Sequence, residues 1–176
     1  TEPFTFKNQD MEFSIWANPR HPFNLDFYQQ VLLKSKAFIE NTLGSFSTKQ
    51  IRVVEIPYHH QAFYTFPNTI AISEKEGWYV DTTRLKERSY LYQTVASQML
   101  SLWLSEHLQT ANVQGADMLN IALPEALSLL FLEEYLGMEA VEILIKKKQT
   151  LYDKNKYNEP NSEPDLIYAD GVDYLE

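Results

Sequence analysis

Three polar side chains on one face of a predicted helix are the first residues of this sequence that could do chemistry. They are Ser97, Gln98 and Ser101, in the stretch VASQMLSLWL at residues 95–104. Residues four apart lie one above the other on a helix, so Ser97 and Ser101 stack with Gln98 beside them. An amide cannot take a proton from water at ordinary pH, and a neutral hydroxyl is a poor zinc ligand. These residues therefore offer neither a general base nor a metal site by themselves.

Their spacing is that of H-E-x-x-H, a motif in which two histidines bind zinc and the glutamate is the general base for the metal-bound water. Serine stands at both histidine positions and glutamine at the glutamate position. On the local pattern alone, an ordinary amphipathic helix is the simpler interpretation. Its apolar side would consist of Leu91, Val95, Met99, Leu102 and Trp103.

The composition excludes several other kinds of chemistry. The 176 residues include no cysteine, which removes disulfides, iron–sulfur centres and thiol nucleophiles. A formal charge of −9 opposes binding to a phosphate backbone, and we expect no nucleic-acid partner. The one basic cluster, residues 146–148, is interpreted as the solvated C-terminal turn of a helix. No run reaches the roughly 18–20 apolar residues that would cross a bilayer.

Hydrophobic periodicity predicts the elements that must position these residues. Strands are predicted at 11–17, 50–58 and 69–74. Helices are predicted at 24–43, 89–107, 123–137 and 138–154. Strands with one early helix come first and the other helices follow, which indicates an α+β fold in a single domain of residues 1–176.

Four segments, in this order along the chain, resemble the aminopeptidase N-like zinc metallopeptidases, the gluzincins. The first is QIRVVEIPYHHQAF with FPNTIAISE, which is similar to the strand, loop and edge strand that carry the family's G-x-M-E-N-P-G-L-I-T signature. The second is VASQMLSLWL, similar to V-A-H-E-x-x-H-Q-W-F. The third is LPEALSLLFLEEYLG, similar to the W-L-N-E-G-F-A helix, and the fourth is IYADGVDYL, similar to V-Y-E-K-G-A-x-V-L. The resemblance implies a thermolysin-like fold, with a small mixed β-sheet packed on a helical bundle and truncated at the C-terminus.

The resemblance also implies a vestigial site. It places Glu125 at the family's third zinc ligand and Tyr168 at the tyrosine that stabilises the oxyanion. It places Phe66 at or near the glutamate that holds the amino terminus of the substrate. Because both histidines and the glutamate of H-E-x-x-H are replaced, the lone Glu125 carboxylate is not expected to retain zinc. We therefore expect no cofactor and a catalytically inactive domain, a pseudo-peptidase.

The expected role is that of a binding or scaffolding module. A peptide or protein ligand would add as a strand to the edge of the sheet, with residues 69–74 as the rim of the groove. The resemblance further implies a longer bacterial parent protein, in which such a domain is fused to a membrane transporter and lies outside the cytoplasm.

Two alternatives stay open. One is a working zinc-dependent peptidase with non-standard ligands, in which His59 or His60 joins Glu125 at the metal. The other is an unrelated interaction domain with an accidental resemblance, for which Ser97 and Glu125 would lie far apart.

Overall fold

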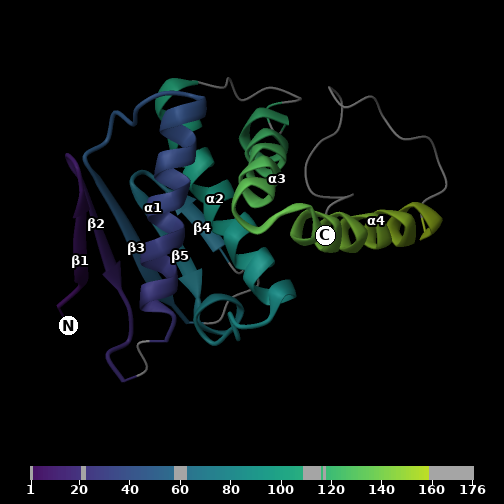
Figure 1. Ribbon diagram of the computed structural model, residues 1–176, viewed down its shortest axis with the longest axis horizontal. Coiled ribbons are helices and arrows are strands. Elements are labelled where there is room, and N and C mark those ends of the chain that lie inside the picture. The colour runs from purple at the N-terminus through teal and green to yellow at the C-terminus, as the bar shows by residue number, and fades with distance from the viewer. Residues whose placement is uncertain (1, 21–22, 58–62, 109–115, 117, 159–176) are drawn as a thin grey trace.

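A computed structural model of the chain describes residues 2–20, 23–57, 63–108, 116 and 118–158 (Figure 1). Five strands form one sheet in the order β1-β2-β3-β5-β4. The strands are β1 (Phe4–Asn8), β2 (Met11–Trp16), β3 (Gln50–Ile56), β4 (Phe63–Phe66) and β5 (Thr69–Ser73). The three inner strands run parallel to one another, and β1 and β4 pair antiparallel at the two edges. The sheet is therefore mixed, as the resemblance implies.

In the described residues, one helix lies between the second and third strands of the chain, and the other helices follow the last strand. They are α1 (Leu25–Thr42), α2 (Leu85–His107), α3 (Leu123–Leu136) and α4 (Met138–Asn158), with short π-helical segments η1 (Glu74–Trp78) and η2 (Met118–Ala122). The first helix connects the parallel strands β2 and β3, because parallel neighbours need a crossover. Helices α1 and α2 contact each other, and α3 and α4 pack on α2 and on one another (Figure 1). The predicted α+β fold, strands with one early helix and then the other helices, is confirmed.

The core lies between one face of the sheet and the helices. Alternate residues of a strand point to the same face, and Phe13, Ile51 and Ile70 from three neighbouring strands are fully buried. The helical residues that meet them include Tyr28, Val31, Leu32 and Ile39 on α1 and Val95, Met99 and Leu102 on α2. The apolar side of α2 is thus the one expected from its periodicity. None of the helices in the described part of the chain is both long and apolar enough to span a membrane.

Strand β4 corrects the expected edge of the sheet. The sequence predicts residues 69–74 as the rim of a groove, but β5 lies inside the sheet, between β3 and β4. The chain reverses at Pro67 and Asn68, where Asn68 has a φ of 56°. Asparagine tolerates this left-handed conformation better than most residues, so a two-residue loop can return β4 against β5. The edge strand at this side of the sheet is β4.

The ends of two helices also differ from the prediction. Helix α2 begins at Leu85, before the predicted start at residue 89, and α4 continues to Asn158. The three lysines at 146–148 therefore lie inside α4, and their interpretation as a C-terminal turn is wrong. No glycine or proline interrupts residues 138–159, so no helix-breaking residue ends α4 at the lysines.

Candidate functional site

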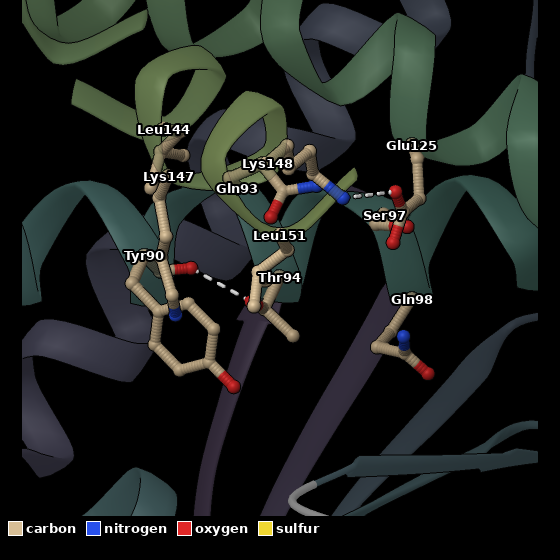
Figure 2. A pocket seen from close by; sticks show the side chains of 10 residues that line it. All are labelled: Tyr90, Gln93, Thr94, Ser97, Gln98, Glu125, Leu144, Lys147, Lys148 and Leu151. Atoms are coloured by element: carbon tan, nitrogen blue, oxygen red, sulfur yellow. Dashed lines mark hydrogen bonds and ion pairs between the residues drawn. The ribbon is translucent and has the colours of Figure 1, made fainter. Parts of the chain in front are cut away.

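A cavity of about 240 Å³ lies between α2, α3 and α4 (Figure 2). One wall consists of side chains from α2, namely Tyr90, Gln93, Thr94, Ser97 and Gln98. Their spacing of three or four residues places them on one side of the helix. The cavity therefore opens on the polar side of α2, which carries the residues singled out in the sequence.

The polar side of α2 is only partly solvated. Gln93 and Ser97 are 5% and 6% exposed, whereas Ser105, further along the same side, is exposed. Helices α3 and α4 pack on α2 and cover the first half of this side. The interpretation of α2 as an amphipathic surface helix is therefore incomplete, because half of its polar side faces other helices.

Ser97, Gln98 and Glu125 line the same cavity, although Glu125 belongs to α3. If the resemblance were accidental, Ser97 and Glu125 would be expected to lie far apart, but both line the same cavity. Ser101 lies one turn further along α2, and its hydroxyl donates a hydrogen bond of 3.0 Å to the carbonyl oxygen of Ser97. The hydroxyl hydrogen of Ser101 is thus used within its own helix.

Phe66 lies away from this cavity. It is 54% exposed and stacks on Tyr64, with ring centroids 6.5 Å apart. Because side chains alternate along a strand, Thr65 points to the opposite face, where its hydroxyl donates a hydrogen bond to Oε1 of Gln98. Thr65 is therefore the β4 residue that contacts the predicted site. The segment 63–66 has aromatic residues on both faces, so the sequence alone carries no signal that favours Thr65 over Phe66.

Three other predicted residues, Tyr168 and the pair His59 and His60, lie outside the described residues, so their roles stay predictions. Over the ranges that the structure describes, no three His, Cys, Asp or Glu side chains are grouped closely enough to hold a metal ion.

An ion pair closes the side of the cavity that α3 and α4 form. The Lys148 Nζ atom donates to Oε2 of Glu125 at 2.5 Å (Figure 2). Glu125 lies in the first turn of α3, where the helix dipole also favours a carboxylate. One residue earlier on α4, the Nζ atom of Lys147 lies 5.1 Å from the centroid of the Tyr90 ring. Neither lysine is among the predicted site residues, since nothing in the local pattern places α4 opposite α2.

A buried hydrogen bond beside the cavity joins α2 to α3. Gln93 Nε2 donates to Ser128 Oγ at 2.9 Å, and Ser128 Oγ donates to the carbonyl oxygen of Glu125 at 2.6 Å.

Substitution of Ser128 by alanine is expected to lower the free energy of unfolding by about 1–3 kcal/mol, because the Gln93 amide loses its partner in a buried position. Urea denaturation measures this. The exposed Ser105→Ala is the control, with an expected change within about 0.5 kcal/mol. Equal effects of the two substitutions would show that water reaches Gln93.

No protein-family model and no curated protein matches this sequence. Among solved structures, its fold is similar to the crystal structure of Legionella pneumophila aminopeptidase A in complex with aspartic acid, with a TM-score of 0.67 and 14% sequence identity. The fold is peptidase-like. The match covers 81% of this chain and 17% of that chain. At this identity the similarity shows the fold alone. It does not show that the chain is a gluzincin or that it has lost catalysis.

Proposed function

We propose that this chain is a catalytically inactive, gluzincin-like domain that binds a peptide or protein segment without cleaving it. The ion pair between Glu125 and Lys148 carries this proposal. The carboxylate that could act as a metal ligand already has an ammonium group at 2.5 Å. A metal ion would have to displace that lysine, so the positive charge beside Glu125 comes from the protein itself.

The remaining side chains of the cavity support the same conclusion. Peptide hydrolysis needs an activated water and a donor that stabilises the oxyanion. Gln98 has no basic atom, and the Ser97 hydroxyl has no imidazole beside it among the residues that line the cavity. Hydroxyl and amide groups can instead hold a ligand by hydrogen bonds.

The exposed edge of β4 supplies a place for a peptide backbone. Among the described strands β4 pairs with β5 alone, so N–H and C=O groups on its other side could bond to a further strand. The bond from Thr65 to Gln98 connects this edge with the wall of the cavity. A peptide added to β4 would therefore pass close to the cavity.

Metal content and hydrolysis test the loss of catalysis. Protein purified without added metal is expected to contain no stoichiometric zinc by plasma mass spectrometry. It is also expected to hydrolyse aminoacyl p-nitroanilides no faster than buffer, with or without a chelator. One equivalent of zinc together with hydrolysis that the chelator abolishes would establish the zinc-dependent peptidase instead.

Methylation of the peptide backbone tests strand addition. In an added strand, alternate peptide N–H groups bond to the edge and the others face away. For a fluorescent peptide selected from a random library, N-methylation at every second position is expected to abolish binding in a fluorescence anisotropy titration. Methylation at the intervening positions is expected to preserve it. An effect without this alternation would contradict strand addition to β4.

A further inference from the structure

We infer that the cavity between α2, α3 and α4 recognises a carboxylate group next to an apolar side chain, which is the chemistry of a peptide's C-terminal residue. This inference rests on the proposed function, because it names the part of a bound peptide that enters the cavity.

The ionic side chains that line the cavity leave a positive charge. They are Glu125, Lys147 and Lys148, and Glu125 and Lys148 neutralise each other at 2.5 Å. Lys147 forms no ion pair with any carboxylate in the part of the chain that the structure describes. Its ammonium lies over the Tyr90 ring, and a ring face attracts a cation while leaving N–H groups for an anion. This local positive charge contrasts with the formal charge of −9 of the whole chain.

A neutral donor, Gln98, lines the α2 wall of the same cavity. The Oε1 atom of Gln98 accepts the hydroxyl hydrogen of Thr65, which leaves the amide N–H groups of Gln98 as donors beside the cavity (Figure 2). A carboxylate has two oxygen atoms, each of which accepts such bonds. The carboxylate can face Lys147, while Gln98, two turns of α2 beyond Tyr90, can donate to a carbonyl oxygen further along the same peptide.

The apolar lining and the volume of the cavity restrict the side chain that can enter it together with the carboxylate. Leu144 and Leu151 of α4 line the cavity beside the ring of Tyr90. Its volume of about 240 Å³ is below the roughly 300–1,000 Å³ of typical small-molecule sites, so it suits a single apolar residue. An ammonium group would meet two lysines and a carboxylate that is already paired, and like charges disfavour it. The cavity therefore selects the carboxyl end of a peptide over its amino end.

Three probes test this with the protein as it stands: N-acetyl-Gly-Gly-Leu, its C-terminal amide, and N-acetylleucine. Titrations followed by ¹⁵N chemical shifts are expected to show the amide binding at least roughly tenfold more weakly than the acid. N-acetylleucine distinguishes the two sources of a carboxylate, namely the C-terminus of a peptide and a free carboxylic acid. Stronger binding of the tripeptide acid supports a peptide end, and equal binding overturns it in favour of a free carboxylic acid. Equal binding of acid and amide, or no binding of any probe, overturns the inference.

Two neighbouring lysines provide a matched pair of variants. Lys147→Gln is expected to weaken binding of the tripeptide acid roughly tenfold and to remove its salt dependence. Lys146→Gln, which removes an exposed lysine paired with Glu142 at 3.1 Å, is expected to leave binding unchanged. Equal effects of the two variants would refute the assignment of Lys147.

The two proposals can fail separately. If the carboxylate preference is absent but alternating N-methylation still matters, the carboxylate site is refuted and strand addition to β4 stands. If the carboxylate preference is present but N-methylation has no alternating effect, strand addition is refuted and the carboxylate site stands.

Discussion

A chain that carries Ser97→His, Gln98→Glu and Ser101→His is expected to bind one zinc ion, whereas the unsubstituted chain is expected to bind none tightly. The substitutions place two imidazoles one turn apart on α2 and a general base beside them. Glu125 lines the same cavity as residues 97 and 98 and would serve as the third ligand. Catalytic zinc sites need three protein ligands, and under the proposed assignment the unsubstituted chain would offer one of them, Glu125.

The expected gain in zinc affinity is at least roughly a thousandfold, because ligand atoms supply most of the binding free energy of such sites. Competition with a chromophoric chelator measures it. Adding Lys148→Met to the triple variant is expected to raise the affinity further, because the ammonium group that pairs with Glu125 is removed. A lower affinity after this addition would show that Glu125 is not a ligand.

A second triple variant, with Ser97→His, Gln98→Glu and Ser105→His, has the same composition and the wrong spacing. Residue 105 lies about 12 Å along the axis from residue 97, at 1.5 Å per residue, so the two imidazoles cannot share an ion. Its zinc affinity is expected to stay close to that of the unsubstituted chain. Equal affinities of the two triple variants would remove the basis for the gluzincin-like assignment of α2 and α3.

Substitution of Trp78 by alanine is expected to lower the free energy of unfolding by about 3–5 kcal/mol. Trp78 is fully buried, and its ring centroid lies 4.5 Å from that of Tyr28. Its Nε1 atom donates to the carbonyl oxygen of Ile72 at 3.3 Å. Alanine would leave a cavity in the core and remove the hydrogen bond to Ile72. Guanidinium denaturation at 25 °C measures the loss.

The residues around Trp78 are held in place, so they would not move into the cavity and offset the loss in the free energy of unfolding. The Asn24 side chain donates to the carbonyl oxygens of Trp78 and Val80, both at 2.9 Å, and so holds η1 against the start of α1. A Cβ atom on Gly77 would lie 2.2 Å from a side-chain carbon of Ile72, so this segment has no spare room. A region fixed from several sides collapses poorly around a new cavity.

Tyr79→Ala is the control for Trp78→Ala, since Tyr79 is the next residue and is 49% exposed. Its substitution is expected to change the free energy of unfolding by less than about 1 kcal/mol. Trp78→Phe is expected to fall between the two, because it keeps an aromatic ring and loses the bond to Ile72. Similar losses at positions 78 and 79 would mean that the core does not pack around Trp78.

Most of the fold was predictable because burial leaves a periodic trace in the sequence. The inner strands β2, β3 and β5 and all four helices occur close to their predicted positions. The two edge strands, β1 and β4, were not predicted as separate strands. Each has one neighbour among the described strands, and their residues are exposed or half-buried, so neither has the buried apolar run that marks an inner strand.

The candidate site was predictable only in part, for a related reason. The resemblance led to Ser97, Gln98 and Glu125, which do line one cavity. It also led to Phe66, whereas the β4 side chain that reaches Gln98 belongs to Thr65. A shift of one residue in register moves a side chain to the other face of a sheet, and only the pairing of β4 with β5 sets that register.

The sequence by itself determined the chemistry that α2 can offer. Hydroxyl and amide groups at positions 97, 98 and 101 are neither imidazole nor carboxylate, however the chain folds. Only the tertiary structure decided what those groups face. Lys147 and Lys148 reach the cavity because α4 packs across α2, a contact between segments about 50 residues apart. Local periodicity tells which side of each helix is apolar, but not which helix will cover it, since that depends on how all the apolar surfaces are buried together.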